Sequence, residues 1–87
     1  PCPFEKLEDL IEAVAASNLP HGTKNSLIAT LDAALRSLER GNTALAVNQL
    51  GAFINQVKAQ RGKAIPAMFA DALILAAEEI IAMLWGT

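Results

Sequence analysis

Apolar residues recur at spacings of three and four along most of the chain, which is the period of a helix buried on one side. The repeat is clearest near the start, where apolar and acidic side chains take opposite sides of a predicted helix over 4–17. The apolar members are Phe4, Leu7, Leu10, Ile11 and Val14, and the acidic members are Glu5, Glu8, Asp9 and Glu12. We interpret the carboxylates as a solvated face rather than as metal ligands, because all four project from one helix without loop ligands.

Prolines and glycines mark the ends of three further helices. Pro20 and Pro66 suit first helical turns, because proline fixes φ and lacks a backbone donor that would go unused there. Gly41 and Gly62 suit positions just past a helix end, where a left-handed residue closes the last turn. The predicted helices span 20–40, 43–61 and 66–85, the second of them capped by Asn42 or Thr43.

The connections between these helices are short, so consecutive helices must run antiparallel. Sustained alternation of apolar and polar residues, the mark of a strand, is missing. We therefore predict an all-α fold, an antiparallel up-and-down four-helix bundle. It forms one domain over residues 1–87, with 1–3 as an extended N-terminal tether.

The outer side of the predicted helix 43–61 carries small and amide residues where a surface helix usually carries charge. Its core side comprises Ala46, Val47, Leu50, Phe53, Ile54 and Val57. Gly51 lies on the outer side and costs about 1 kcal/mol relative to Ala, which suggests that another backbone approaches closely. For Asn48 and Asn55 three interpretations stay open: exposed residues, buried residues bonded to neighbouring helix ends, or a surface that meets a partner.

The predicted helix 66–85 is apolar nearly all round, with Asp71, Glu78 and Glu79 as its charged residues. We expect its core stripe to comprise Phe69, Ala72, Leu73, Ala76, Ile80, Met83 and Leu84. A second stripe comprises Ile74, Ile81 and Trp85, and Met68 and Leu75 are apolar as well. A helix of this kind is usually buried on more than one side, so we predict contact with another subunit or an adjoining domain. The alternative is scattered apolar surface of the ordinary kind.

Composition excludes several classes of protein. An apolar fraction of 53% rules out a disordered chain, and a formal charge of −2 argues against a general nucleic-acid binder. Three acidic residues interrupt the longest apolar run, so we predict no membrane span.

The sequence offers little for catalysis or ligation. One His and one Cys exclude a zinc set, and every Ser-His-Asp arrangement would depend on His21. We predict no catalytic, cofactor-binding or metal site, and hence no enzyme. Cys2, between two prolines, is either an incidental thiol or a disulfide link to another chain or domain.

Two segments carry a resemblance to a known family: Arg40-Gly41-Asn42 and Leu50-Gly51-Ala52-Phe53-Ile54. They resemble the FIMAH-type helical modules found at the C-terminal ends of secreted multidomain bacterial and archaeal proteins. The resemblance runs from about Leu7 to Leu84, although Asn55-Gln56 replaces the Met-Ala-His of the family's name. It implies an extracellular, non-catalytic appendage and supplies no catalytic residues.

We therefore expect a non-catalytic module of an exported protein, secreted or at the cell surface, that works through protein–protein contact. It would be either an accessory domain or a self-associating subunit. The expected contact residues are Ile74, Leu75, Ile81 and Trp85, followed by Asn48, Gly51, Ala52 and Asn55. The alternative function is a polysaccharide- or cell-wall-binding module that depends on Trp85. A third, an acidic regulator of a basic partner, rests on the carboxylates of 4–17 alone.

Overall fold

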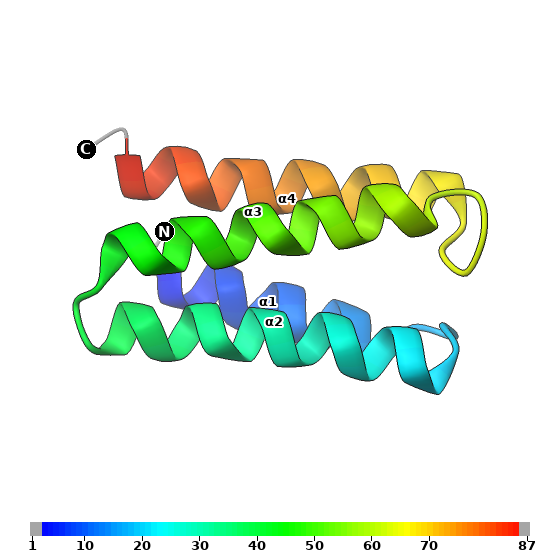
Figure 1. Cartoon of the computed structure of the whole chain (residues 1–87), viewed down its shortest axis with the longest axis horizontal. Coiled ribbons are helices and arrows are strands. Elements are labelled where there is room, and N and C mark those ends of the chain that lie inside the picture. Colours follow the sequence, from blue (N-terminus) through cyan, green and yellow to red (C-terminus); the bar gives the residue numbers. More distant parts are fainter. Residues whose placement is uncertain (1–2, 86–87) are drawn as a thin grey trace.

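A computed structural model describes residues 3–85 as four helices and places no β-strand among them (Figure 1). The helices are α1 (Pro3–Ala15), α2 (His21–Glu39), α3 (Thr43–Gln60) and α4 (Ala67–Trp85). Each helix end lies within two residues of its prediction. Pro3, expected in the tether, belongs to α1, and residues 1–2 lie outside the described part of the chain.

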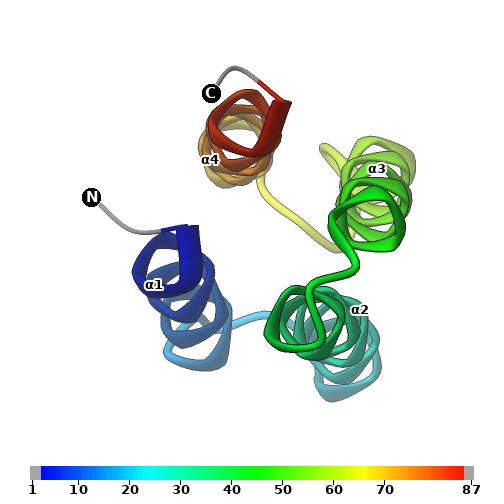
Figure 2. The same cartoon turned by 90° about the vertical axis from the view of Figure 1, so that its left-hand side faces the viewer.

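The helices occupy the four corners of a square when the molecule is viewed along its length (Figure 2). Each packs against two neighbours: α2 against α1 and α3, and α4 against α3 and α1. The contact between α2 and α3 is the most extensive and that between α1 and α4 the least, in a molecule of 34 × 20 × 20 Å. This arrangement confirms the predicted antiparallel four-helix bundle. None of the four described helices is long and apolar enough to cross a bilayer.

The turn between α2 and α3 is built by the predicted glycine and asparagine. Gly41 has φ 78°, and its N–H donates to the carbonyl of Leu38 at 2.9 Å. The N–H of Asn42 donates to the carbonyl of Ser37 at 2.8 Å, which completes a Schellman motif. The Asn42 side chain then accepts from the N–H of Leu45 at 3.2 Å and so caps α3.

The turn between α3 and α4 closes on a buried residue. Gly62 has φ 76°, as its predicted role requires, and its N–H donates to the carbonyl of Ile65 at 2.7 Å. The Ile65 side chain is fully buried, so it anchors the turn in the core. Arg61, at the start of the turn, reaches forward to bind Asp71 on α4.

The core follows the predicted stripes on α1 and α3, except that Phe4 is exposed, and every helix contributes to it. Its buried members are Leu7, Leu10 and Val14 from α1; Leu27, Leu31, Ala34 and Leu38 from α2; Ala46, Leu50, Phe53, Ile54 and Val57 from α3; Ala70, Leu73, Ala77 and Ile80 from α4; and Leu19 and Ile65 from the connections.

The predicted division of α4 into two stripes is wrong. The expected core residues Leu73 and Ile80 are buried, but the other two members of the buried line are Ala70 and Ala77, which belong to neither expected stripe. Ile74 and Ile81, expected on a separate contact surface, lie partly buried against the chain's own core. Small residues at the centre of the line let α4 approach its neighbours closely, so larger side chains on both flanks reach the same core. Ala72, expected in the core, is exposed.

Candidate functional site

Three large apolar side chains remain exposed on α4. The exposed fractions are 87% for Met68, 58% for Leu75 and 64% for Trp85. Met68 and Leu75 are seven residues apart and therefore share one side of the helix. Of the four contact residues predicted on α4, Leu75 and Trp85 are accessible, whereas Ile74 and Ile81 are largely used by the fold.

The exposed apolar side of α4 lies among acidic residues. Asp71, Glu78 and Glu79 are all exposed, and the ion pairs among residues 3–85 include Asp71 but neither glutamate. Arg61 binds Asp71 with two hydrogen bonds, from Nε to Oδ1 at 2.7 Å and from Nη2 to Oδ2 at 2.9 Å. These bonds, together with the positive charge of Arg61, hold the pKa of Asp71 below its ordinary value. The same hydrogen bonding raises the pKa of Arg61.

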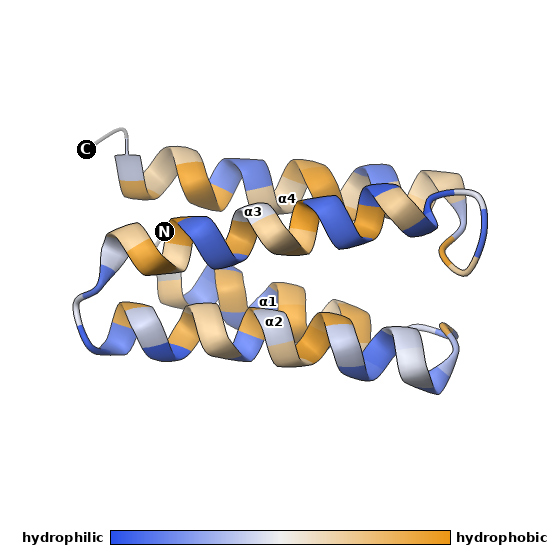
Figure 3. Ribbon diagram, viewed as in Figure 1, coloured by the Kyte–Doolittle hydropathy of each residue, from blue (hydrophilic) through white to orange (hydrophobic). Residues whose placement is uncertain are grey.

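Next to α4, α3 presents a second surface, which we call the outer row of α3. It consists of Leu45, Asn48, Ala52, Asn55 and Ala59, all of them exposed and none charged. In Figure 3 the ribbon of α3 alternates between strongly hydrophilic and apolar residues. The spacing of three, four, three and four residues places the row along one line of the helix.

The exposure of Asn48 and Asn55 excludes one of the three interpretations given for them above. Because Asn48 and Asn55 are exposed, they do not play a buried structural role. Within the described chain no other helix approaches Gly51 closely, since no atom outside its own stretch of α3 lies within 4 Å of the position that a Cβ would occupy. The remaining interpretations are ordinary surface and a surface that meets a partner.

The amides that do join helices are the next residues along, Gln49 and Gln56. Gln49 Oε1 lies 2.7 Å from the hydroxyl of Ser37, which is buried. Gln56 Oε1 accepts from Thr30 Oγ1 at 3.0 Å, and Gln56 Nε2 donates to Ser26 Oγ at 3.3 Å. Sequence reasoning missed this contact. The matching polar strip on α2, formed by these Ser and Thr residues, was the signal that could have revealed it.

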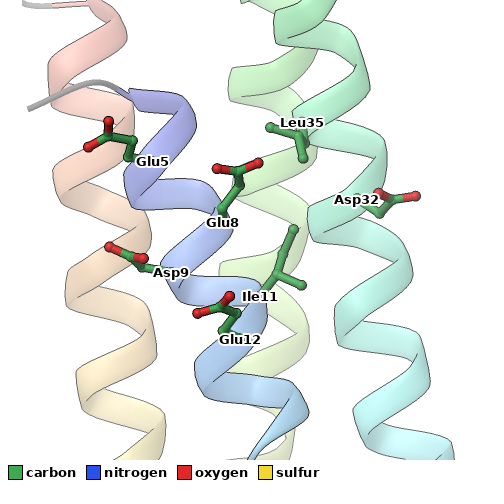
Figure 4. Close-up of a pocket in the computed structure, with 7 residues that line it drawn as sticks. All are labelled: Glu5, Glu8, Asp9, Ile11, Glu12, Asp32 and Leu35. Atoms are coloured by element: carbon green, nitrogen blue, oxygen red, sulfur yellow. The ribbon is translucent and has the colours of Figure 1, made fainter.

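A hollow of about 560 Å³ lies between α1 and α2 and carries the predicted acidic face (Figure 4). It is lined by Glu5, Glu8, Asp9, Ile11, Glu12, Asp32 and Leu35. In Figure 4 the carboxylates of Glu5 and Asp9 point toward α4, whereas Asp32 points to the opposite side, where it pairs with Arg36 at 3.2 Å. The carboxylates therefore do not converge, and within residues 3–85 no group of three His, Cys, Asp or Glu side chains is placed to hold a metal ion.

A smaller hollow, of about 280 Å³, lies between α1 and α4. Its apolar lining includes Leu10, Ala13 and Phe69, and its polar lining consists of Lys6, Asp9 and Glu79. The single histidine, His21, is exposed in the first turn of α2. Cys2 lies outside the described residues, so its disulfide stays a prediction.

Comparison with known proteins adds one finding. A family model described as the FIMAH domain matches residues 4–82, nearly the whole chain. No curated protein and no solved structure gives a match.

Proposed function

This chain belongs to the FIMAH domain family, whose members are small helical accessory modules, and we propose that it acts as a non-catalytic module of an exported protein through contact with other proteins. The proposal has three parts: the chain is exported, it does not catalyse a reaction, and its partner is a protein. The proposal of export draws on the resemblance to modules of secreted proteins, and the proposal of a non-catalytic role draws on the accessory character of the family.

The observation that carries the proposal is the exposure of Met68, Leu75 and Trp85 on one helix of a small bundle. Exposed apolar side chains gathered on one element mark contact surfaces more often than scattered ones do. Covering them would contribute about 25 cal/mol per Å² of apolar surface, before the cost of ordering two partners is subtracted.

A photo-crosslinking residue placed at Leu75, at Trp85 and, as a matched control, at Glu12 on the acidic side of α1 tests this proposal. In protein made by the source organism, we expect the first two positions to crosslink to a defined protein and position 12 to give background. The identified partner, once purified, should bind Leu75→Lys at least about tenfold more weakly than the unmodified chain. Equal crosslinking at all three positions would contradict a contact surface on α4.

A second candidate, binding of polysaccharide or cell wall, is favoured by the exposure of Trp85 alone. An aromatic ring at the end of a helix offers a flat face for stacking on a sugar. Retention on insoluble cell-wall polysaccharide that is lost in Trp85→Ala and kept in Leu75→Lys would favour this function over protein contact.

A further inference from the structure

We propose that the exposed side of α4, together with the hollow between α1 and α4, binds an amphipathic helix of the partner protein that carries Lys or Arg on both flanks of its apolar stripe. This inference rests on the proposed function and deepens it, since it names the chemistry of the partner at the α4 surface.

The exposed side of α4 has an apolar line along its centre. Met68, Leu75 and Ala82 are seven residues apart and all exposed, so they lie along one side of the helix. Trp85, also exposed, continues this side at the end of α4. From Met68 to Trp85 the surface is about 26 Å long at 1.5 Å per residue, which is the length of a helix of about 18 residues. A repeat of seven is the spacing at which two helices contact each other along their length, so the surface fits a helical partner.

Two carboxylates border this line, one on each flank. At about 100° per residue, Glu78 lies about 60° to one side of Leu75 and Glu79 about 40° to the other side. Both are exposed, and the ion pairs within residues 3–85 include neither of them. Asp71, on the same flank as Glu78, is already held by Arg61. The negative charge left without a counterion therefore flanks the part of α4 that follows Leu75.

The hollow between α1 and α4 adjoins the flank that carries Glu79. Its lining includes Ala76 and Glu79 of α4 and Asp9 and Leu10 of α1. Its volume of about 280 Å³ is below the roughly 300–1,000 Å³ of small-molecule sites, so it suits a side chain of a larger partner. Lys6, the one cation of the lining, belongs to no ion pair within residues 3–85. The hollow therefore offers an apolar side chain a place beside carboxylates that a basic neighbour would neutralise.

Charge complementarity selects the occupant of this surface. On a helix whose apolar stripe covers Leu75, Lys or Arg on the two flanks would lie opposite Glu78 and Glu79. A second copy of the chain that met α4 with its own α4 would instead bring the same glutamates together, and an anionic lipid surface would also be repelled. A cationic amphipathic helix is therefore the partner that both the apolar line and its flanks accept.

A pair of designed peptides tests this chemistry. Each is a helix of about 18 residues with leucines at spacings of three and four, and the two differ in carrying either Lys or Glu on both flanks. Fluorescence anisotropy of the labelled peptides, titrated with the chain, measures binding. We expect the Lys peptide to bind at least about tenfold more tightly than the Glu peptide, and its affinity to fall as salt is added. Equal affinity of the two peptides, or no binding of the Lys peptide, would overturn the inference.

Two double variants of the chain remove the same charge from different places. Glu78→Gln with Glu79→Gln neutralises the flanks of α4, whereas Glu8→Gln with Glu12→Gln neutralises two carboxylates of the hollow between α1 and α2. We expect the first to weaken binding of the Lys peptide by about three- to tenfold and the second to leave it unchanged. All four side chains are exposed, so both variants should keep the circular dichroism of the unmodified chain. An equal loss in both would mean that the peptide is attracted to the net charge alone, which would overturn the inference.

The failure of this inference can be told apart from the failure of the proposed function. Leu75→Lys places a cation in the apolar line and should weaken binding of the Lys peptide at least about tenfold. Unchanged binding by this variant would place the peptide elsewhere on the chain and overturn the inference. A protein that crosslinks at Leu75 and Trp85 through an acidic or non-helical segment would also overturn it, while leaving the proposed function standing.

Discussion

The inner and outer sides of α3 have the same spacing of residues, but the inner side chains are buried and the outer ones are exposed. On the inner side, Leu50, Phe53 and Val57 are fully buried and hold the other helices in place. On the outer side, Asn48, Ala52 and the other members of the row are exposed. A surface helix commonly carries charges on such a side, and this one does not.

The difference between the two sides shows which side-chain identities are constrained by packing within the bundle and which are not. Side chains of the inner side are constrained by packing, so their identities follow from the need for a filled core. Packing within the bundle places no comparable constraint on the outer row, and its uncharged composition needs another reason. Substitutions at matched positions on the two sides show which residues contribute to the stability of the fold and which do not.

Leucine truncation on the two sides should give the largest difference. Leu50→Ala removes a fully buried side chain, so we expect the free energy of unfolding to fall by about 2–5 kcal/mol. Leu45→Ala, where the side chain is 42% exposed, should cost less than about 1 kcal/mol. Urea unfolding of both variants measures the contrast, and equal losses would mean that the outer row is part of the folded core.

Glycine replacement should give effects of opposite sign. Gly51→Ala should stabilise the chain by about 1 kcal/mol, because Ala is the better helix former and the space around Gly51 is open. Gly62→Ala should destabilise it by a similar amount of about 1 kcal/mol, because φ at Gly62 is 76°. Thermal unfolding measures both. A loss of stability in Gly51→Ala would show that another backbone does approach this side of α3.

Neighbouring amides should behave differently although they are chemically alike. Gln56→Ala removes the hydrogen bonds to Thr30 and Ser26, so we expect a loss of about 1 kcal/mol. Asn55→Ala removes an exposed amide and should raise stability by a few tenths to roughly 0.5 kcal/mol through helix propensity. If a double-mutant cycle of Gln56 with Thr30 shows no coupling energy, the α2–α3 contact does not depend on these bonds.

Acid titration of the ion pair between Arg61 and Asp71 should give the smallest effect. The pKa of Asp71 is lowered in the folded chain by its bonds to Arg61, so the pair stabilises the fold above the ordinary Asp value of 3.8. That stability is lost as the pH falls from there through the lowered pKa. The difference in unfolding free energy between the unmodified chain and Asp71→Asn should be constant near neutral pH and shrink below pH 3.8. A difference independent of pH would mean that the carboxylate titrates normally.

Much of the fold could be predicted from the sequence because its signals are local. Gly41, Asn42 and Gly62 build the turns expected of them, and the inner stripe of α3 forms as the spacing indicates. The contact surfaces were harder to predict, because the exposure of a side chain depends on which other helices pack against it. The sequence of a single helix does not give that information. Ile74 and Ile81 looked like a separate surface, since a helical projection gives no hint that Ala70 and Ala77 bring α4 close enough to bury them.

The amides of α3 also show that the sequence of one helix does not predict which of its residues contact a neighbouring helix. Asn48 and Asn55 share a side of α3, and so do Gln49 and Gln56, each pair being seven residues apart. Nothing in α3 alone says which pair faces α2. The choice depends on the register of α2, whose Ser37 and Thr30 lie opposite the glutamines.

The most direct test of the central claim, that contact with another protein uses the exposed side chains of α4, is a series of amide NMR spectra of uniformly labelled chain titrated with the partner identified by crosslinking. We expect the shifts that change to lie around Met68, Leu75 and Trp85. Amides of α1 around Glu12 should stay constant. Changes confined to α1 or to the outer row of α3 would contradict the claim.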